Sequence, residues 1–379
     1  MANKYKYMFI DAQICLTTGV YAVMHQFKDR RINEQTLLKM FIQSMFKLTR
    51  EVKCDRPYLL WDSAPYHKQT ILKEALGKED YKGDRGYKTA DDVTILKEKL
   101  GPLQVQLKNA EEHPELYSEE ELVALKENLT KEITKIERSI DDIEVQIHNF
   151  QVRGAVKRKI IDTLGDFGYT SIIMGGYEAD DIAQLLVDYC TERKEKVLLV
   201  SKDSDWDYML TPYADKYDHY TKNAAVAKDP SLKWKTYESV KKELWWTERD
   251  FPGWKLSEIK RYQDSLYGSH NALKACLHPE WKKAGVFLKE VIDHLDEACS
   301  DKALFEAQMK TSDFTLYPKY EFMKKCLPWY SKKGHLKSVD EFVKYAKENK
   351  LALNPYSYLD IIKILDYELF DVPEQTDNF

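Results

Sequence analysis

Four short apolar runs, each leading into acidic residues, constrain most strongly what this chain can fold into. The runs lie at residues 7–11, 57–62, 171–174 and 196–201, and amphipathic stretches lie between them at residues 37–48, 155–164 and 179–190. Short continuous apolar strands that alternate with helices are typical of a parallel sheet with both faces covered. The sequence therefore predicts an α/β fold, in which a parallel sheet is flanked by helices.

The acidic residues that follow these runs form a candidate metal site. In chain order they are Asp11, Asp62, Glu178, Asp180, Asp181, Asp203 and Asp205. Because the carboxyl ends of parallel strands are neighbours, this fold would gather the carboxylates in one small volume. So many like charges do not stay ionised together without cations. Oxygen-only ligands select hard divalent ions, and the sequence therefore indicates Mg²⁺ or Mn²⁺.

The spacing of these acids supports their convergence. Asp203 and Asp205 are two residues apart and would point to one side of an extended segment. Glu178 and Asp181 are three residues apart and would share a face of a first helical turn. Each acid taken alone has a second explanation as a helix cap or a turn residue, and so does Asp207. The metal hypothesis therefore depends on the whole set.

Composition narrows the class of protein. The chain has 379 residues, 43% hydrophobic and 32% charged, which excludes a disordered or collagen-like chain. No apolar run approaches the ~18 residues that span a bilayer, and we expect neither a membrane protein nor a signal peptide. The six cysteines form no C-x-x-C pair, which favours a reducing cytoplasm over a disulfide framework. The net charge of −5 argues against a generally basic coat but leaves a local basic groove open.

The section at residues 91–150 predicts an antiparallel helical hairpin. Apolar residues recur there at spacings of three and four along 93–110 and again along 122–150, as in coiled-coil seams. Pro114 breaks the pattern, and Ser118 with Glu121 forms a capping box that starts the second helix. At ~1.5 Å per residue that helix would be about 45–50 Å long and would project as an arm.

The predicted arm differs in charge from the rest of the chain. Residues 91–150 carry a net charge of −8, and the remainder carries +3. An acidic surface is poorly suited to phosphates and well suited to a protein partner. A solvated hairpin that serves only as a spacer is the alternative.

A basic and aromatic loop follows Asp62. Its candidate nucleic-acid-binding residues are Lys68, Lys73, Tyr81, Lys82, Arg85, Tyr87 and Lys88. Lys82 and Arg85 could hold a phosphate, as a point charge and a planar fork respectively. Tyr81 and Tyr87 could stack on bases. An ordinary surface loop remains the alternative.

The order of these motifs resembles the flap endonuclease and 5′–3′ exonuclease family. The likeness is greatest to its phage-encoded members, including the RNase H-like kind that removes primers. The matching motifs are F-I-D ending at Asp11, L-L-W-D ending at Asp62, Y-K-G-D-R at 81–85, G-Y-E-A-D-D at 176–181 and S-K-D-S-D-W-D at 201–207. They extend over roughly residues 5–215, and the helical insertion within that range is dissimilar.

This resemblance implies a role for each matched residue. Two Mg²⁺ or Mn²⁺ ions would be held by Asp11, Asp62, Glu178, Asp180, Asp203 and Asp205, with Asp181 in or just outside the ligand shell. Such ions activate a water and stabilise the leaving oxygen. Lys82 and Arg85 would be catalytic, contacting the scissile phosphate and stabilising the transition state. The insertion would take the place of the family's helical arch, through or past which single-stranded 5′ ends go.

The C-terminal region departs from the family pattern. The family has a helix–hairpin–helix-like module with a G-D-x-x-D-N core and glycines that bind the duplex backbone. The nearest stretch here is residues 262–271, in which Asp264 matches the first acid. The second acid and the glycine-rich clamp are missing, so this DNA-binding segment is degenerate. Asp264 is either a further metal ligand or an acid on a helix surface.

These observations predict three sections and one function. The sections are a nuclease core at residues 1–90 and 151–222, the arm at 91–150, and a helical C-terminal region at 223–379. We expect a structure-specific 5′ nuclease, an exonuclease or flap endonuclease. It would act in replication or repair on DNA with 5′ ends or flaps and on RNA–DNA hybrids, in a bacterial or phage-infected cytoplasm. A PIN-like endoribonuclease is the second reading, and a non-enzymatic replication scaffold that binds a partner through the arm is the third.

Overall fold

The computed structural model describes residues 4–27, 30–63, 88–173, 175, 177–219, 221, 224–243, 331–332 and 336–365. The chain divides into two compact units. The first contains Met1–Thr18, Phe41–Tyr81 and Ile161–Phe379, and the second contains Gly19–Met40 and Lys82–Ile160. None of the described helices is both long and apolar enough to cross a membrane.

The first unit is built on one sheet. Within the described residues it has seven strands in the order β6-β5-β4-β1-β2-β3-β7. Their bounds are β1 Tyr5–Asp11, β2 Cys54–Trp61, β3 Thr170–Ile173, β4 Val197–Val200, β5 Ala214–Tyr217, β6 Trp234–Lys235 and β7 Ser331–Lys332. The inner five strands pair in parallel, which confirms the predicted α/β fold. The edge strands β6 and β7 pair antiparallel, a feature that the prediction of a parallel sheet missed.

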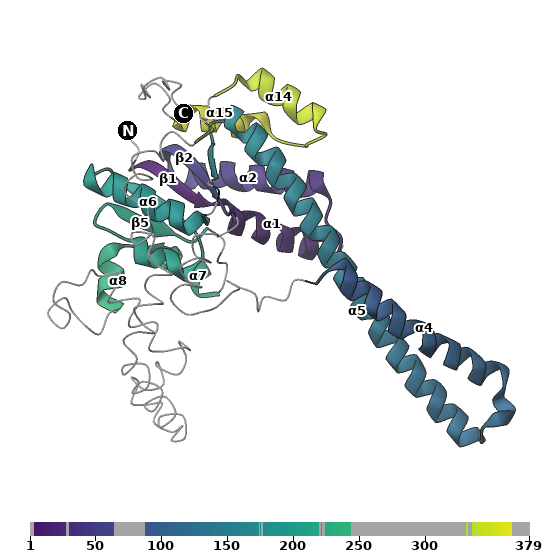
Figure 1. The fold of residues 1–379 in the computed structure, drawn as a ribbon. Coiled ribbons are helices and arrows are strands. Elements are labelled where there is room, and N and C mark those ends of the chain that lie inside the picture. Colours follow the sequence, from purple (N-terminus) through teal and green to yellow (C-terminus); the bar gives the residue numbers. More distant parts are fainter. Residues whose placement is uncertain are drawn as a thin grey trace, which may run out of the picture. The chain divides into compact units, whose positions relative to one another are not determined.

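Helices cover both faces of this sheet. Leu60 and Phe9 belong to a buried cluster with Ile182 of α6 (Ala179–Glu192), which lies along the sheet in Figure 1. The next residue, Trp61, stacks on Phe41 of α2 (Glu34–Val52), with ring centroids 6.1 Å apart. Because neighbouring strand residues point to opposite faces, α6 and this part of α2 lie on opposite sides. Burial on both faces explains why the strand sequences are continuously apolar.

Further helices and 3-10 turns complete the first unit and its connections. Their bounds are α1 Ala12–Phe27, η3 Leu164–Asp166, η4 Ser204–Met209, α7 Ala224–Lys228, η5 Pro230–Lys233, α8 Tyr237–Glu243, α14 Val339–Glu348 and α15 Pro355–Ile364. Phe342 of α14 and Tyr358 of α15 stack with centroids 4.5 Å apart, and both contact Phe46 of α2. This aromatic cluster anchors α14 and α15, two helices of the predicted helical C-terminal region, on the first unit.

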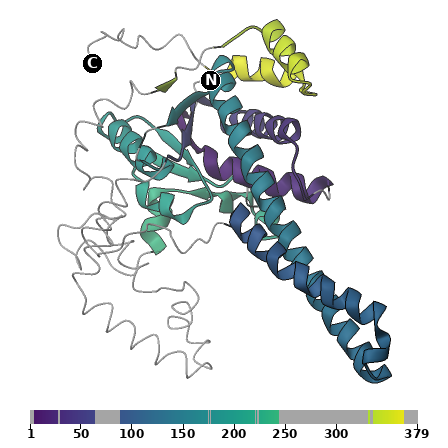
Figure 2. The ribbon, with the colours of Figure 1, turned by 45° about the vertical axis from the view of Figure 1, so that its right-hand side comes forward.

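The second unit contains the predicted helical hairpin. Helix α4 (Ala90–Glu112) and helix α5 (Glu119–Thr163) flank the short η2 (Pro114–Leu116) and run side by side in Figures 1 and 2. Val93 of α4 is buried against Ile140 and Ile143 of α5. The predicted capping box is also present, because the Ser118 N–H donates to Glu121 Oε2 at 3.1 Å and the Glu121 N–H donates to Ser118 Oγ at 3.4 Å.

The predicted end of the second helix is wrong. We expected the arm helix to stop at residue 150 and a separate helix to start at 155, but α5 continues through Gly154 to Thr163 as one helix of 45 residues. Its length is about 68 Å at 1.5 Å per residue. A helical glycine costs only about 1 kcal/mol relative to alanine, and the buried Val152, Val156 and Ile160 continue the apolar stripe through it.

Asn149 of α5 binds the connection between α1 and α2. Its Oδ1 accepts from the Ile32 N–H at 3.0 Å, and its Nδ2 donates to the Arg30 carbonyl at 2.8 Å. Asn149 is buried, so loss of its amide would leave both backbone groups without these partners. Asn149→Leu is therefore expected to lower the free energy of unfolding by about 1–3 kcal/mol. Urea unfolding followed by circular dichroism would measure this. The matched control is Asn128→Leu at an exposed position of α5, and equal stability of the two variants would contradict the assignment.

Candidate active site

The strand order places the candidate site at the centre of the sheet. From β1 the chain adds β2 and β3 on one side, and then β4 and β5 on the other. The carboxyl ends of β1 and β4 therefore flank the point where the strand order reverses, which is where ligands bind in open α/β sheets. Asp11 is the last residue of β1, and Ser201 to Asp203 follow directly after β4.

Asp11 is held rigidly at this point. The Ile14 N–H donates to its Oδ1 at 2.9 Å, so the carboxylate caps the first turn of α1. The Ser201 hydroxyl donates to its Oδ2 at 3.0 Å, and the same hydroxyl accepts from the Asp203 N–H at 3.0 Å. Ser201 thereby ties Asp11 to the segment that follows β4. Sequence reasoning did not single out Ser201, although it is the first residue of the S-K-D-S-D-W-D motif.

The electrostatics of Asp11 reveal its acidic neighbours. Only 5% of this residue is exposed. Burial, as the largest cause, and the carboxylates of Asp62 and Asp203 together raise its pKa to about 7, against the hydrogen bonds from Ile14 and Ser201 that lower it. Acids from the ends of β1, β2 and β4 therefore interact across one edge of the sheet, as the sequence predicted for these three residues.

The remaining described acids gather at the start of α6. Asp62 Oδ1 accepts from the Ala179 N–H at 2.9 Å. Asp181 Oδ2 accepts from the Glu178 N–H, and Asp180 Oδ1 accepts from the Asp181 N–H, each at 2.9 Å. Glu178 and Asp181 are buried. These carboxylates thus serve as helix caps, the alternative that the sequence had left open for each of them, while they also lie beside the β2 end.

The described residues place no three His, Cys, Asp or Glu side chains where they could jointly hold a metal ion. The donor chemistry nevertheless fits a hard divalent cation, because it consists of carboxylate oxygens around a buried acid whose ionised form its neighbours disfavour. The backbone of Asp205 lies in η4, two residues after Asp203. The ligand set proposed from the sequence therefore remains a prediction.

A buried ion-pair network connects the 203–207 turn to β5 and β6. Asp207 accepts from Lys216 Nζ of β5 at 2.7 Å and from Lys235 Nζ of β6 at 2.5 Å. Lys216 also donates to the Asp203 carbonyl. The side chains of Lys216 and Asp207 are only 5% and 2% exposed. Burial lowers the pKa of Lys216, and Asp207 opposes that shift. The network fixes the backbone of the 203–207 turn from two strands.

Sequence reasoning had left a helix cap or a turn residue open as explanations of Asp207 and had not considered Lys216 or Lys235. A lysine inside a four-residue buried strand was the available signal, and it is weak, because a lysine there is equally consistent with an exposed edge strand.

One predicted site residue belongs to the second unit, and others fall outside the described residues. Lys88 is exposed and pairs with Asp92 Oδ1 at 3.8 Å, at the start of α4. Six other loop residues and the C-terminal acid fall outside the described residues, namely Lys68, Lys73, Tyr81, Lys82, Arg85, Tyr87 and Asp264. Their roles remain predictions.

The fold and site define an α/β protein with interacting acids at the switch point of a mainly parallel sheet. Among solved structures, the chain is similar to a T5 protein co-crystallised with metal ions, at 13% identity over 95% of this chain and 99% of that chain, with a TM-score of 0.41. It is also similar to a bacteriophage T5 flap endonuclease in a pseudo-enzyme–product complex with DNA and metal ions, at 14% identity over 94% and 98% of the two chains, with a TM-score of 0.38. A T5 5′-exonuclease with bound zinc matches at 14% identity over 95% and 99% of the two chains, with a TM-score of 0.37. No family model and no curated protein matches the chain.

Proposed function

We propose that this protein is a divalent-metal-dependent 5′ nuclease that hydrolyses phosphodiester bonds in DNA. The observation that carries the proposal is the buried Asp11, which interacts with Asp62 and Asp203 at the switch point of the sheet. A site with this much negative charge repels a phosphodiester, so cations are needed before such a substrate can approach. The motifs around these acids, in their order along the chain, support the 5′ nuclease class.

The proposed ligands of two Mg²⁺ or Mn²⁺ ions are Asp11, Asp62, Glu178, Asp180, Asp203 and Asp205, with Asp181 supporting them and Asp264 as a further candidate. When bound, such ions supply an activated water and stabilise the leaving oxygen of an in-line displacement. The chain's own contribution is orientation. Ser201 and the Ile14 N–H fix both oxygens of Asp11, and Lys216 fixes the carbonyl of Asp203. Lys82 and Arg85 would hold the scissile phosphate.

The proposed substrates are DNA with 5′ single-stranded ends or flaps, and RNA–DNA hybrids such as primers. The setting is replication or repair in a bacterial or phage-infected cytoplasm. Residues 223–379 would bind duplex DNA through the degenerate helix–hairpin–helix-like segment. The arm would bind a protein, since its net charge of −8 is unfavourable for phosphates.

The proposal is tested by cleavage of 5′-labelled flap DNA and of an RNA strand of the same sequence, each with Mg²⁺ or EDTA. The wild-type protein is expected to cut the DNA only with Mg²⁺. Asp203→Asn should bind DNA and lose cleavage by about a thousandfold, because it removes one negative charge from the cation site. The control Asp340→Asn makes the same chemical change at an exposed position of α14 and should cleave normally.

Other outcomes would favour the competing functions. Cleavage of the RNA strand alone would favour a PIN-like endoribonuclease. If the folded protein shows no metal-dependent cleavage, the proposed nuclease activity would be wrong, and the replication scaffold would be favoured.

A further inference from the structure

One exposed face of α5 carries its charges in separate blocks. The residues of this face, which we call the charged face, are Glu120, Ala124, Glu127, Lys131, Lys135 and Arg138. They recur every three or four residues and therefore lie in one row along the helix. All six are exposed. Two acids occupy the N-terminal half of the row and three cations occupy the C-terminal half.

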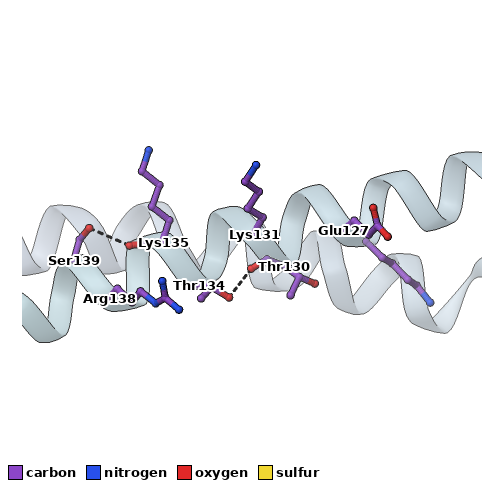
Figure 3. A pocket seen from close by; sticks show the side chains of 8 residues that line it. Glu127, Thr130, Lys131, Thr134, Lys135, Arg138 and Ser139 are labelled. Atoms are coloured by element: carbon purple, nitrogen blue, oxygen red, sulfur yellow. Dashed lines mark hydrogen bonds between the residues drawn. The ribbon is translucent and has the colours of Figure 1, made fainter.

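The cations of the charged face form no ion pair with any described residue. In the same unit, by contrast, Arg30 pairs with Asp141 at 2.5 Å and Lys97 pairs with Glu144 at 3.1 Å. Figure 3 shows Lys131 and Lys135 projecting side by side from α5, along a groove that Arg138 and Glu127 also line. The Thr134 and Ser139 hydroxyls donate to the helix's own carbonyls of Thr130 and Lys135 at 2.7 and 3.0 Å. The cations are thus the donors that this face offers to a partner.

The charge order is complementary to itself. If a second copy lies antiparallel across a two-fold axis near residue 129, Glu120 faces Arg138 and Glu127 faces Lys131. Ala124 then faces Thr134, and these small residues permit close approach of the helices. The aliphatic stem of Lys135 faces Val123, which is 53% exposed. A two-fold axis repeats every such contact twice.

We propose that the charged face of α5 binds the same face of a second copy of this chain, so that two arms associate antiparallel. A phosphate backbone fits this surface less well, because Glu120 and Glu127 share it and the arm carries a net charge of −8. An unrelated acidic helix would satisfy the cations but would be repelled by the two acids. The second copy satisfies both signs of charge, and this assignment is independent of the proposed nuclease activity.

The association is expected to be weak and sensitive to salt. A single row of side chains on one helix gives a small interface, and exposed ion pairs contribute little individually. Dimers should therefore form only at tens of micromolar protein, in the range of weak, transient complexes. They should dissociate between about 50 mM and about 500 mM NaCl, as the Debye length falls.

Sedimentation velocity with the full chain at up to about 100 μM tests this proposal in the weak-affinity range. Wild type should show a concentration-dependent monomer–dimer equilibrium in low salt. Lys131→Glu with Arg138→Glu makes the face almost wholly acidic and should remain monomeric. Adding Glu120→Lys and Glu127→Lys to that variant reverses the order of charges and should restore the dimer. The control Lys99→Glu with Lys228→Glu changes the net charge equally at exposed positions outside the charged face and should dimerise as wild type does.

The fourfold variant distinguishes self-association from binding to another partner. Only a second copy of the same chain carries the four substitutions as well, so only self-association regains complementary charges. Circular dichroism of each variant would confirm that α5 remains helical. A wild type that stays monomeric at the highest concentration would overturn the proposal, as would failure of the fourfold variant to regain the dimer. If the wild type stays monomeric and Lys131→Glu with Arg138→Glu lowers the affinity for single-stranded DNA, the charged face binds phosphates instead.

Discussion

Asp11→Asn is expected to stabilise the metal-free protein at pH 8 and to abolish its metal-dependent cleavage. Burial and the neighbouring acids raise the pKa of Asp11 from 3.8 to about 7. Between these values the folded state keeps a proton that the unfolded state has lost, so the stability that this group contributes falls as pH rises through that window. An asparagine does not titrate, and the variant should therefore gain about 1–3 kcal/mol over wild type at pH 8 and almost nothing near pH 4.

The same substitution removes one negative charge from the proposed cation site. Cleavage with Mg²⁺ should fall about a thousandfold, and the rise in melting temperature that Mg²⁺ gives the wild type should shrink. Urea unfolding in EDTA at both pH values, followed by the flap-cleavage assay, measures both effects. Asp340→Asn is the control for each. Equal stability of wild type and Asp11→Asn at pH 8 would remove Asp11 from an acidic cluster, and unchanged cleavage would remove it from the metal site.

Asp207→Asn is expected to cost about 3–5 kcal/mol of unfolding free energy, which is the usual result of breaking a buried ion pair from one side. The reason is that Lys216 remains buried after its counter-ion is lost, while the less buried Lys235 can turn to solvent. The control Asp360→Asn removes a half-exposed partner of Arg50 and should cost under about 1 kcal/mol.

A double variant separates charge from shape in this network. Lys216→Met added to Asp207→Asn removes the buried cation as well, so the double variant should be more stable than Asp207→Asn alone. Guanidinium unfolding of wild type, both single variants and the double variant completes the double-mutant cycle. If the two substitutions simply add, then Lys216 and Asp207 do not interact energetically, and the network would not be what fixes the 203–207 turn.

The local patterns of the sequence predicted the local structure well. The apolar runs became β1 to β4, and the Ser118–Glu121 capping box starts α5, since both depend only on residues close in the chain. The two-residue strands β6 and β7 are too short to leave a periodic signal. The continuity of α5 through Gly154 was missed because tertiary burial of Val152 and Val156 offsets the low helix propensity of glycine.

The site was predictable only in part. The acids at the ends of β1, β2 and β4 were expected to interact, and Asp11, Asp62 and Asp203 do. The partners of these acids were not predictable, because they come from elsewhere in the fold. Ser201 contacts Asp11 because β4 pairs with β1, and Lys216 contacts Asp207 because β5 pairs with β4. Strand order arises from long-range packing and leaves no local mark in the sequence.

The acids at the start of α6 accept hydrogen bonds from backbone N–H groups at this end of the helix and also supply negative charge to the candidate site. These two roles determine how the residues can be studied by mutation. An alanine at Asp62 or Asp181 would remove a carboxylate and also leave the N–H of Ala179 or of the N-cap residue Glu178 without this acceptor. A lost activity would then have two causes that no single assay separates. Asparagine caps a helix about as well as aspartate does while carrying no charge. Replacement by the amide is therefore the suitable scan at these positions, because it removes the charge and keeps the cap. Comparison of each amide variant with the alanine variant then measures the contribution of the capping hydrogen bond.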